Sequence, residues 1–242
     1  MKKIIFLVLC TTLIRYSVAQ SSAPSDTPSD PKATVLENPA TRPVSPTWIV
    51  PETHIAFVNV NDTVDSEWLQ ELAASMQRQL LLSIKPIPLN VESVGDALTL
   101  YATVRKELSD DAKMVVVIAK MGNAKDGIPI LAAPQNGWAV MDADWVTSVK
   151  ADKATTDTRM RKQLHRALGF AAGTGMQSAP QAIMYAASVP EDLDNALSSN
   201  YHPDNVTVIK STAKAKGIEA IRIQPRSGRQ PKPAETAKEV TP

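Results

Sequence analysis

The pattern of apolar positions in residues 55–80 predicts a strand followed by a helix. Residues 55–60 are mostly β-branched or aromatic, which is typical of a buried strand. Asp65 or Ser66 can then cap a helix, because a short polar side chain accepts hydrogen bonds from the free N–H groups of the first turn. The apolar residues of this helix recur at spacings of three and four and so share one face: Leu69, Leu72, Met76 and Leu80.

The following segment repeats the order of strand and helix and ends in a third strand. A short strand is predicted near Ile87–Val91, and Ser93 with Asp96 forms a capping pair before the second helix. Residues 113–119 are almost continuously apolar, the pattern of a strand buried on both faces in the middle of a parallel sheet. Alternating strands and helices indicate an α/β fold with right-handed crossovers. The predicted inward face of the second helix consists of Ala97, Tyr101, Val104 and Leu108.

Beyond residue 122 the pattern changes to one that is typical of a hairpin. Asn136-Gly137 is a turn signal between two short apolar segments, so a hairpin is predicted from Ile128 to Met141. Its second strand, Trp138-Ala139-Val140-Met141, is predicted to be the antiparallel edge strand. The predicted fold class is therefore α/β, with a mixed, mostly parallel, twisted sheet that has an antiparallel edge strand and is packed by helices.

A third helix is predicted around residues 160–170, with Asp157 or Thr158 as its cap. Its apolar residues recur at helical spacing, which leaves Lys162 and Arg166 on a basic outer face. Glycines at positions 169, 173 and 175 are predicted to end the helix. The apolar face consists of Met160, Leu164, Ala167 and Leu168.

Three further elements are predicted toward the end of the chain. Ser188–Glu191 begins a helix that contains Leu193 and Leu197. Residues 206–216 form another helix that ends at Gly217, because glycine readily adopts the left-handed conformation at a helix C-terminus. The alternating pattern of residues 218–223 is that of a last strand.

The first 19 residues are predicted to be a secretory signal peptide. Lys2 and Lys3 precede an apolar core that is too short to span a membrane. Ser17-Val18-Ala19 has the small-x-small pattern of a signal peptidase site, so cleavage is predicted after Ala19 and the mature protein is expected to be secreted or periplasmic. Cys10 is the single cysteine and lies in this segment, so the mature chain has neither disulfides nor thiolate ligands. A secreted chain without disulfides favours a bacterial origin.

Composition divides the mature chain into one domain and two terminal segments. Residues 20–46 are rich in Ser, Pro, Thr and Asp, and residues 225–242 are rich in Pro and Lys, so both are predicted to be disordered. Residues 47–224 remain as a single α/β domain. Loss of three basic residues with the signal peptide lowers the 26 basic residues to 23 against 25 acidic ones, and a net charge of −2 gives no indication of nucleic-acid binding.

One stretch of this helix resembles the active-site helix of the metzincin zinc peptidases, which often reads His-Glu-Leu-Gly-His-Ala-Leu-Gly-Phe. In this chain the stretch reads Lys162-Gln163-Leu164-His165-Arg166-Ala167-Leu168-Gly169-Phe170. Lys162 and Arg166 stand where the two histidine ligands belong, and Gln163 stands at the position of the general-base glutamate. The apolar positions and Gly169 match. Met184-Tyr185 lies where the methionine turn of that family comes, and the order of elements is closest to that of archaemetzincins.

This resemblance implies a metzincin-like domain that has lost its metal chemistry. The usual third ligand falls at Ala172, or at Gly173 in archaemetzincin spacing, and neither residue binds zinc. The expectation is therefore a non-catalytic pseudopeptidase with no catalytic residues, no metal and no cofactor. Its vestigial substrate groove, along the predicted edge strand 138–141, is expected to bind a peptide or protein. Lys162 and Arg166 favour a partner with acidic groups.

Two other classes of function stay open from the sequence. One is an active secreted metallopeptidase or hydrolase that uses non-standard ligands. Its candidate ligands would be Asp142, Asp144, His54 and His202, which show no metal spacing along the chain. The other is an envelope α/β binding domain unrelated to metzincins.

Overall fold

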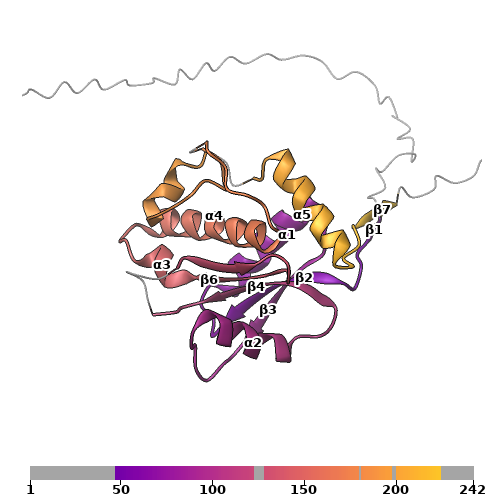
Figure 1. The fold of residues 1–242 in the computed structure, drawn as a ribbon, viewed down its shortest axis with the longest axis horizontal. Helices are drawn as coiled ribbons and strands as arrows, with labels where there is room; N and C mark the ends of the chain where they lie inside the picture. The colour runs from indigo at the N-terminus through magenta and orange to yellow at the C-terminus, as the bar shows by residue number, and fades with distance from the viewer. Residues whose placement is uncertain (1–46, 123–127, 180, 198–199, 225–242) are drawn as a thin grey trace, which may run out of the picture. The chain divides into compact units, whose positions relative to one another are not determined.

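The computed structural model describes residues 47–122, 128–179, 181–197 and 200–224 (Figure 1). The predicted signal peptide, the spacer 20–46 and the tail 225–242 lie outside the described residues. Within the described part of the chain, no helix combines the length and the apolar character that crossing a membrane requires.

The centre of the domain is a five-stranded sheet in the order β3-β2-β4-β6-β5. Strands β2 (His54–Val60), β3 (Ile84–Leu89), β4 (Ala112–Ala119) and β6 (Trp138–Asp142) run parallel, and β5 (Ile130–Ala133) pairs antiparallel with β6. Strand β4 lies in the middle and is almost entirely buried, which confirms its prediction as a central strand. The predicted fold class is therefore confirmed.

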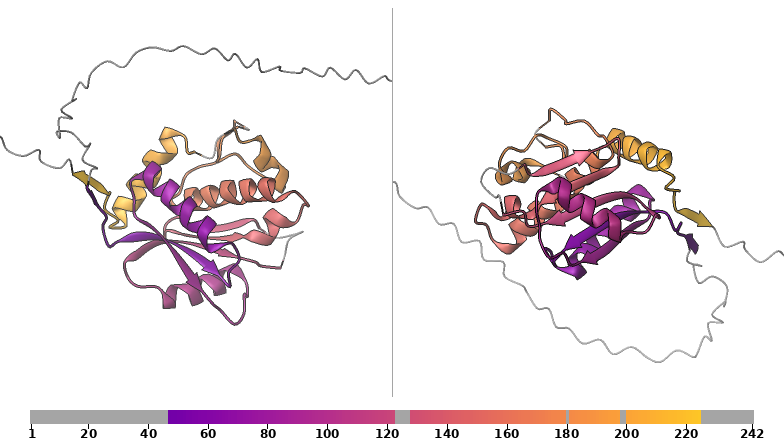
Figure 2. Two further views of the ribbon diagram at one scale, coloured as in Figure 1. Left: turned by 180° about the vertical axis from the view of Figure 1, so that it is seen from behind. Right: turned by 60° about the horizontal axis from the view of Figure 1, so that its bottom comes forward.

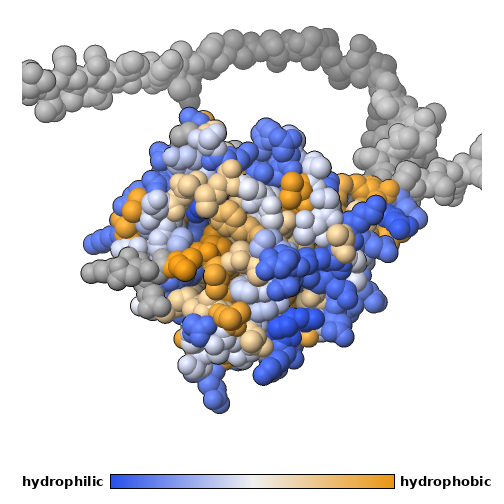
Figure 3. All heavy atoms as spheres, in the orientation of Figure 1, coloured by the Kyte–Doolittle hydropathy of each residue, from blue (hydrophilic) through white to orange (hydrophobic). Residues whose placement is uncertain are grey.

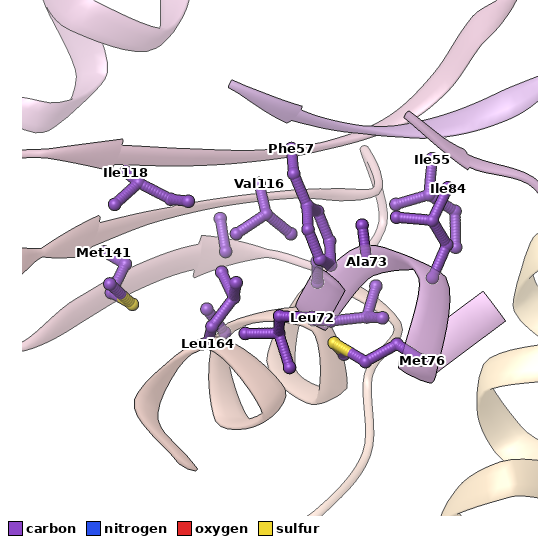
Figure 4. Close-up of a cluster of buried hydrophobic side chains, with 14 of the residues drawn as sticks. Ile55, Phe57, Leu72, Ala73, Met76, Ile84, Val116, Ile118, Met141 and Leu164 are labelled. Carbon is purple, nitrogen blue, oxygen red and sulfur yellow. The ribbon is translucent and has the colours of Figure 1, made fainter. Parts of the chain in front are cut away.

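Helices cover both faces of this sheet (Figures 1 and 2). Helices α1 (Ser66–Leu80), α4 (Lys153–Ala171) and α5 (Pro203–Ala215) lie on one face, and α2 (Ala97–Glu107) lies on the other. Successive strand residues point to opposite faces, so each strand contributes to two hydrophobic clusters. In the larger cluster, the side chains of α1 and α4 pack against those of β2 and β4, as Figure 4 shows for Phe57, Val116, Leu72 and Leu164.

Four short elements complete the described fold. Helix α3 (Ala143–Thr147) follows β6, and the 3-10 helix η1 (Pro190–Asn195) packs against α4. Strands β1 (Thr47–Ile49) and β7 (Arg222–Gln224) form a separate two-stranded antiparallel sheet. The last predicted strand is thus shorter than residues 218–223 and does not join the central sheet.

The prediction that residues 138–141 form the edge strand is wrong. These residues belong to β6, which pairs with β4 on one side and β5 on the other, and all of β6 is buried. Strand β5 is the edge of the described sheet on that side. The apolar run Trp138-Ala139-Val140-Met141 shows no alternation with polar residues, which is the pattern of an internal strand.

Two predicted boundaries also shift. Strand β3 lies at Ile84–Leu89 rather than at 87–91, and it accommodates Pro86 and Pro88 because an edge strand has backbone groups that need no partner strand. Helix α2 is capped by Asp96, which accepts from the backbone of Leu98 and Thr99; Ser93 takes no part in the cap.

Candidate functional site

Helix α4 begins earlier and ends later than the sequence pattern predicts. It spans Lys153–Ala171, and its N-cap is Asp152, whose Oδ1 accepts from the N–H of Thr155 at 2.8 Å. Gly173, with φ +82°, provides the left-handed residue after the helix. Gly169 therefore lies inside the last turns of α4 and does not end it.

The predicted basic outer face of α4 is buried. Arg159, Lys162, Gln163, His165 and Arg166 are all buried, and only 6% of Lys162 and 3% of Arg166 are exposed. Strands β5 and β6 contact α4 from the sheet, and η1 and α3 contact it as well. Because buried polar groups are costly unless they are hydrogen-bonded, the partners of these side chains define what the site can do.

Lys162 stands at the position of the first metal ligand in the family pattern. Its Nζ donates to the backbone oxygen of Leu193 in η1 at 2.7 Å, and burial lowers the pKa of the lysine. Asp194, also in η1, acts in the opposite direction through its negative charge. Lys162 therefore connects α4 to a segment 31 residues further along the chain.

Arg159 lies one turn before Lys162 and forms a two-bond ion pair with Asp194. Its Nε donates to Oδ1 at 3.0 Å and its Nη2 to Oδ2 at 2.6 Å. The hydrogen bonds from Arg159 hold the pKa of the Asp194 carboxyl below its usual value. The ion pair and the hydrogen bond of Lys162 together connect η1 to the buried face of α4.

Gln163 and Arg166 occupy the positions of the general base and the second ligand. The Nη1 of Arg166 donates to Oε1 of Gln163 at 2.8 Å, and Nε2 of Gln163 donates to the backbone oxygen of Pro129 at 3.4 Å. The Arg166 guanidinium carbon lies 5.6 Å from the ring centroid of Phe170. Burial lowers the pKa of Arg166 to about 10, and its Nε has no hydrogen-bond partner among the described residues.

Met184 lies directly beneath α4. A Cβ placed on Gly169 would lie 2.6 Å from its Sδ and 2.8 Å from its Cε, and Met184 is completely buried. Gly169 therefore allows the close approach of the segment around Met184-Tyr185 to the helix. The structure thus brings Met184 against Gly169, although the two residues lie 15 positions apart in the chain.

His165 is buried, and its ring lies 5.2 Å from the ring of Tyr201, measured between centroids. Its Nδ1 lies 2.8 Å from the backbone oxygen of Arg161, and the Tyr201 hydroxyl donates to the backbone oxygen of His165 at 2.6 Å. Burial lowers the pKa of His165 to about 4. The imidazole is therefore neutral and structural at physiological pH.

The residues at the metal position do not fit zinc. Zinc requires three neutral or anionic protein ligands, whereas the helix presents an ammonium and a guanidinium at the two ligand positions of the family pattern and an amide at the position of the general base. Lys162 Nζ and Arg166 Nη1 are donors already bonded to oxygen atoms of the protein. In the described part of the chain, no three His, Cys, Asp or Glu residues come together in an arrangement that could hold a metal ion.

The side chains of the four alternative ligands named from the sequence each bond to nearby backbone groups. Asp142 caps α3, and burial raises its pKa, while Asp144 accepts from the N–H of Gly122 at 2.9 Å. His54 Nδ1 lies 2.8 Å from a backbone oxygen before β2, and His202 caps α5. The structure does not bring these four residues together with α4 in one metal site.

Sequence reasoning missed Arg159, Asp194 and Tyr201 as members of this site. Their partners lie 35 or 36 residues away along the chain, so no local spacing indicates them. The one available signal was the position of Arg159 three residues before Lys162, which places both cations on one face of a helix.

We expect Asp194→Asn to lower the free energy of unfolding by about 1–2 kcal/mol, because one of two charge-assisted bonds to buried Arg159 is lost. The matched control is Asp157→Asn, which breaks the ion pair with exposed Lys153 on the same helix and should cost no more than about 0.5 kcal/mol. Urea unfolding measures both variants. Equal costs would show that the Arg159 pair contributes no more than a surface pair.

Comparison with known proteins identifies the fold. The chain is similar to archaemetzincin from Methanopyrus kandleri, with a TM-score of 0.54 and 14% identity over 69% of this chain and 99% of that chain. A zinc-dependent peptidase from Methanocorpusculum labreanum matches with a TM-score of 0.49 and 15% identity over 64% and 99%. Archaemetzincin from Archaeoglobus fulgidus, complexed with malonate, matches with a TM-score of 0.45 and 14% identity over 63% and 98%. No family profile matches the sequence, and no curated protein matches it. The chain therefore has the metzincin-like fold that the sequence pattern predicted.

Proposed function

From the metzincin-like fold as premise, we propose that this chain is a secreted or periplasmic, non-catalytic domain that binds an extended peptide along the free edge of β5. The observation that carries the proposal is the replacement of the metal-binding chemistry on α4 by internal hydrogen bonds. Lys162, Gln163 and Arg166 use their polar atoms to bond Leu193, Pro129 and each other.

The electrostatics of α4 support a non-catalytic role. Lys162 and Arg166 stand one turn apart, and two cations repel a divalent ion. Gln163 cannot act as a general base, because its amide does not take up a proton at physiological pH. Helix α4 therefore lacks both the zinc ligands and the general base of the family pattern.

The edge strand β5 supports peptide binding by strand addition. The N–H of Asp142 donates to the oxygen of Pro129 at 3.1 Å, and bonded and non-bonded pairs alternate along an antiparallel ladder. The backbone groups of Ile130 and Ala132 therefore point away from β6. In Figure 3, apolar residues gather on the face beside β6 and α4, with hydrophilic residues around them.

The proposed peptide-binding groove follows β5, whereas the sequence led us to expect it along residues 138–141, which form the neighbouring strand β6. Residues 138–141 are internal, so their backbone groups are engaged on both sides. Strand β5 is only half-buried and contacts α4, so a peptide on its free edge would run beside the helix.

A metal test and a peptide test examine the two parts of the proposal. We expect purified protein to contain no stoichiometric zinc by elemental analysis and to leave casein uncut after zinc is added.

For the peptide test, we expect a fluorescein-labelled hexapeptide of alternating valine and glutamate to bind, as measured by fluorescence anisotropy. Ala132→Pro should lower its affinity about tenfold, because proline removes an N–H that points away from β6.

The control for the peptide test is Ala132→Val, which keeps the N–H and favours the strand. Equal binding by wild type and Ala132→Pro would exclude strand addition at β5. Stoichiometric zinc together with peptide cleavage would exclude a non-catalytic role, whatever the outcome of the peptide test.

A further inference from the structure

A hollow of about 340 Å³ lies between the first turns of α4 and η1. It is on the side of α4 that faces η1, whereas Gln163 reaches toward β5 through Pro129. The residues that line the hollow are Ala154, Thr155, Thr158, Lys162 and Asp194.

Among the residues that line the hollow, Lys162 has a positively charged group with N–H donors that are not all used. Its ammonium carries three N–H groups, and Leu193 O is its hydrogen-bond acceptor within the described residues. The side chain is buried apart from the part that lines the hollow. Two donors are therefore left for a group that enters the hollow.

The charges around the hollow leave Lys162 without a full counter-charge. Asp194 lines the hollow, but both of its oxygens accept from Arg159. The two threonines add no free donor: the hydroxyl of Thr158 donates to Ala154 O, and that of Thr155 is bonded to Asp152. The ammonium of Lys162 is therefore the group that would bind a ligand, and a small anion with hydrogen-bond acceptors fits it.

We propose that this hollow binds a carboxylate group through Lys162. The inference rests on the proposed function, since it assigns the acidic group of the peptide partner to a defined place beside α4. A carboxylate suits the site because its charge is opposite to that of the ammonium and its oxygens accept N–H groups. The methyl group of Ala154 adds an apolar wall that suits a short aliphatic chain, such as a glutamate side chain or a small free acid.

Two probes distinguish the sources of the carboxylate. Butyrate represents a free acid, and the valine-glutamate hexapeptide represents a peptide, with its glutamine counterpart as the uncharged comparison. Binding is measured by NMR chemical-shift titration of the full mature chain. We expect the hexapeptide to bind about tenfold more tightly than the glutamine peptide, and butyrate to shift resonances around Lys162 and Asp194 at higher concentration.

Three variants test the assignment. Lys162→Met keeps the length of the side chain and should abolish the tenfold preference for glutamate. Ala154→Phe fills the hollow and leaves the bond between Lys162 and Leu193 intact, so it should have the same effect without loss of that contact. Lys153→Met removes an exposed lysine from the same helix and should leave the preference unchanged.

The outcomes separate this inference from the proposed function. If Ala132→Pro weakens both peptides equally and Lys162→Met and Ala154→Phe change nothing, strand addition stands and the carboxylate site is overturned. If butyrate binding depends on Lys162 while Ala132→Pro has no effect on the peptides, the carboxylate site stands and peptide binding at β5 fails. Equal binding of glutamate and glutamine peptides, with no butyrate shifts near Lys162, overturns the inference outright.

Discussion

We expect Met184→Ala to lower the free energy of unfolding by about 2–5 kcal/mol, the range for truncating a large buried side chain. Met184 is completely buried, and its thioether fills the space that Gly169 leaves open under α4. Loss of the side chain leaves a cavity between the helix and the loop that carries residue 184. Urea unfolding monitored by circular dichroism measures the change.

The matched control is Met176→Ala, because Met176 is 67% exposed and its truncation should change stability by no more than about 0.5 kcal/mol. Gly169→Ala provides a second check. Alone it overpacks the contact with Met184 and should cost about 1–3 kcal/mol, and in the Met184→Ala background it should cost clearly less. Additive costs would mean that the two residues do not share one packing site.

Acidification from pH 6.5 to 4 is expected to remove roughly 3 kcal/mol of stability through His165 alone. Burial lowers the pKa of His165 from 6.5 to about 4 in the folded protein. Between these values the unfolded chain binds a proton at this histidine and the folded chain does not, so stability falls as the pH falls. Below pH 4 both states are protonated and this contribution stays constant.

Urea unfolding at pH 7 and pH 4 in wild type and His165→Gln measures this effect. The variant should lose roughly 3 kcal/mol less than wild type, because glutamine does not titrate. His54, whose pKa burial also lowers, and Asp194, whose pKa is lowered by its bond to Arg159, remain in both proteins. An NMR titration that placed the pKa of His165 near 6.5 would contradict the prediction directly.

Local pattern was sufficient for the elements that build the sheet. The apolar run of β4, the helical spacing of Leu69, Leu72, Met76 and Leu80, and the turn at Asn136-Gly137 each predict what the structure contains. These signals are reliable because hydrophobic periodicity follows the geometry of the backbone, which is the same wherever the segment lies. The order of these elements also indicated a metzincin-like fold.

Local pattern was insufficient where burial depends on a distant segment. The polar residues of α4 suggest a solvent-exposed face, yet Lys162 and Arg159 are buried because η1 covers them and supplies Leu193 O and Asp194. Likewise, the hairpin signal led to the prediction that residues 138–141 lie at the sheet edge, and the pairing of β6 with both β4 and β5 shows that they are internal.

The sequence by itself determined the alternation of strands and helices, the central place of β4 and the absence of metal-binding side chains at positions 162 and 166. Only the tertiary structure decided that Lys162 and Arg166 bond to other parts of the protein, that Met184 packs against Gly169 and that β5 is the edge strand of the described sheet. The physical reason is that a side chain's type is fixed by the chain, whereas its solvent exposure and its hydrogen-bond partner are set by residues that folding brings from elsewhere.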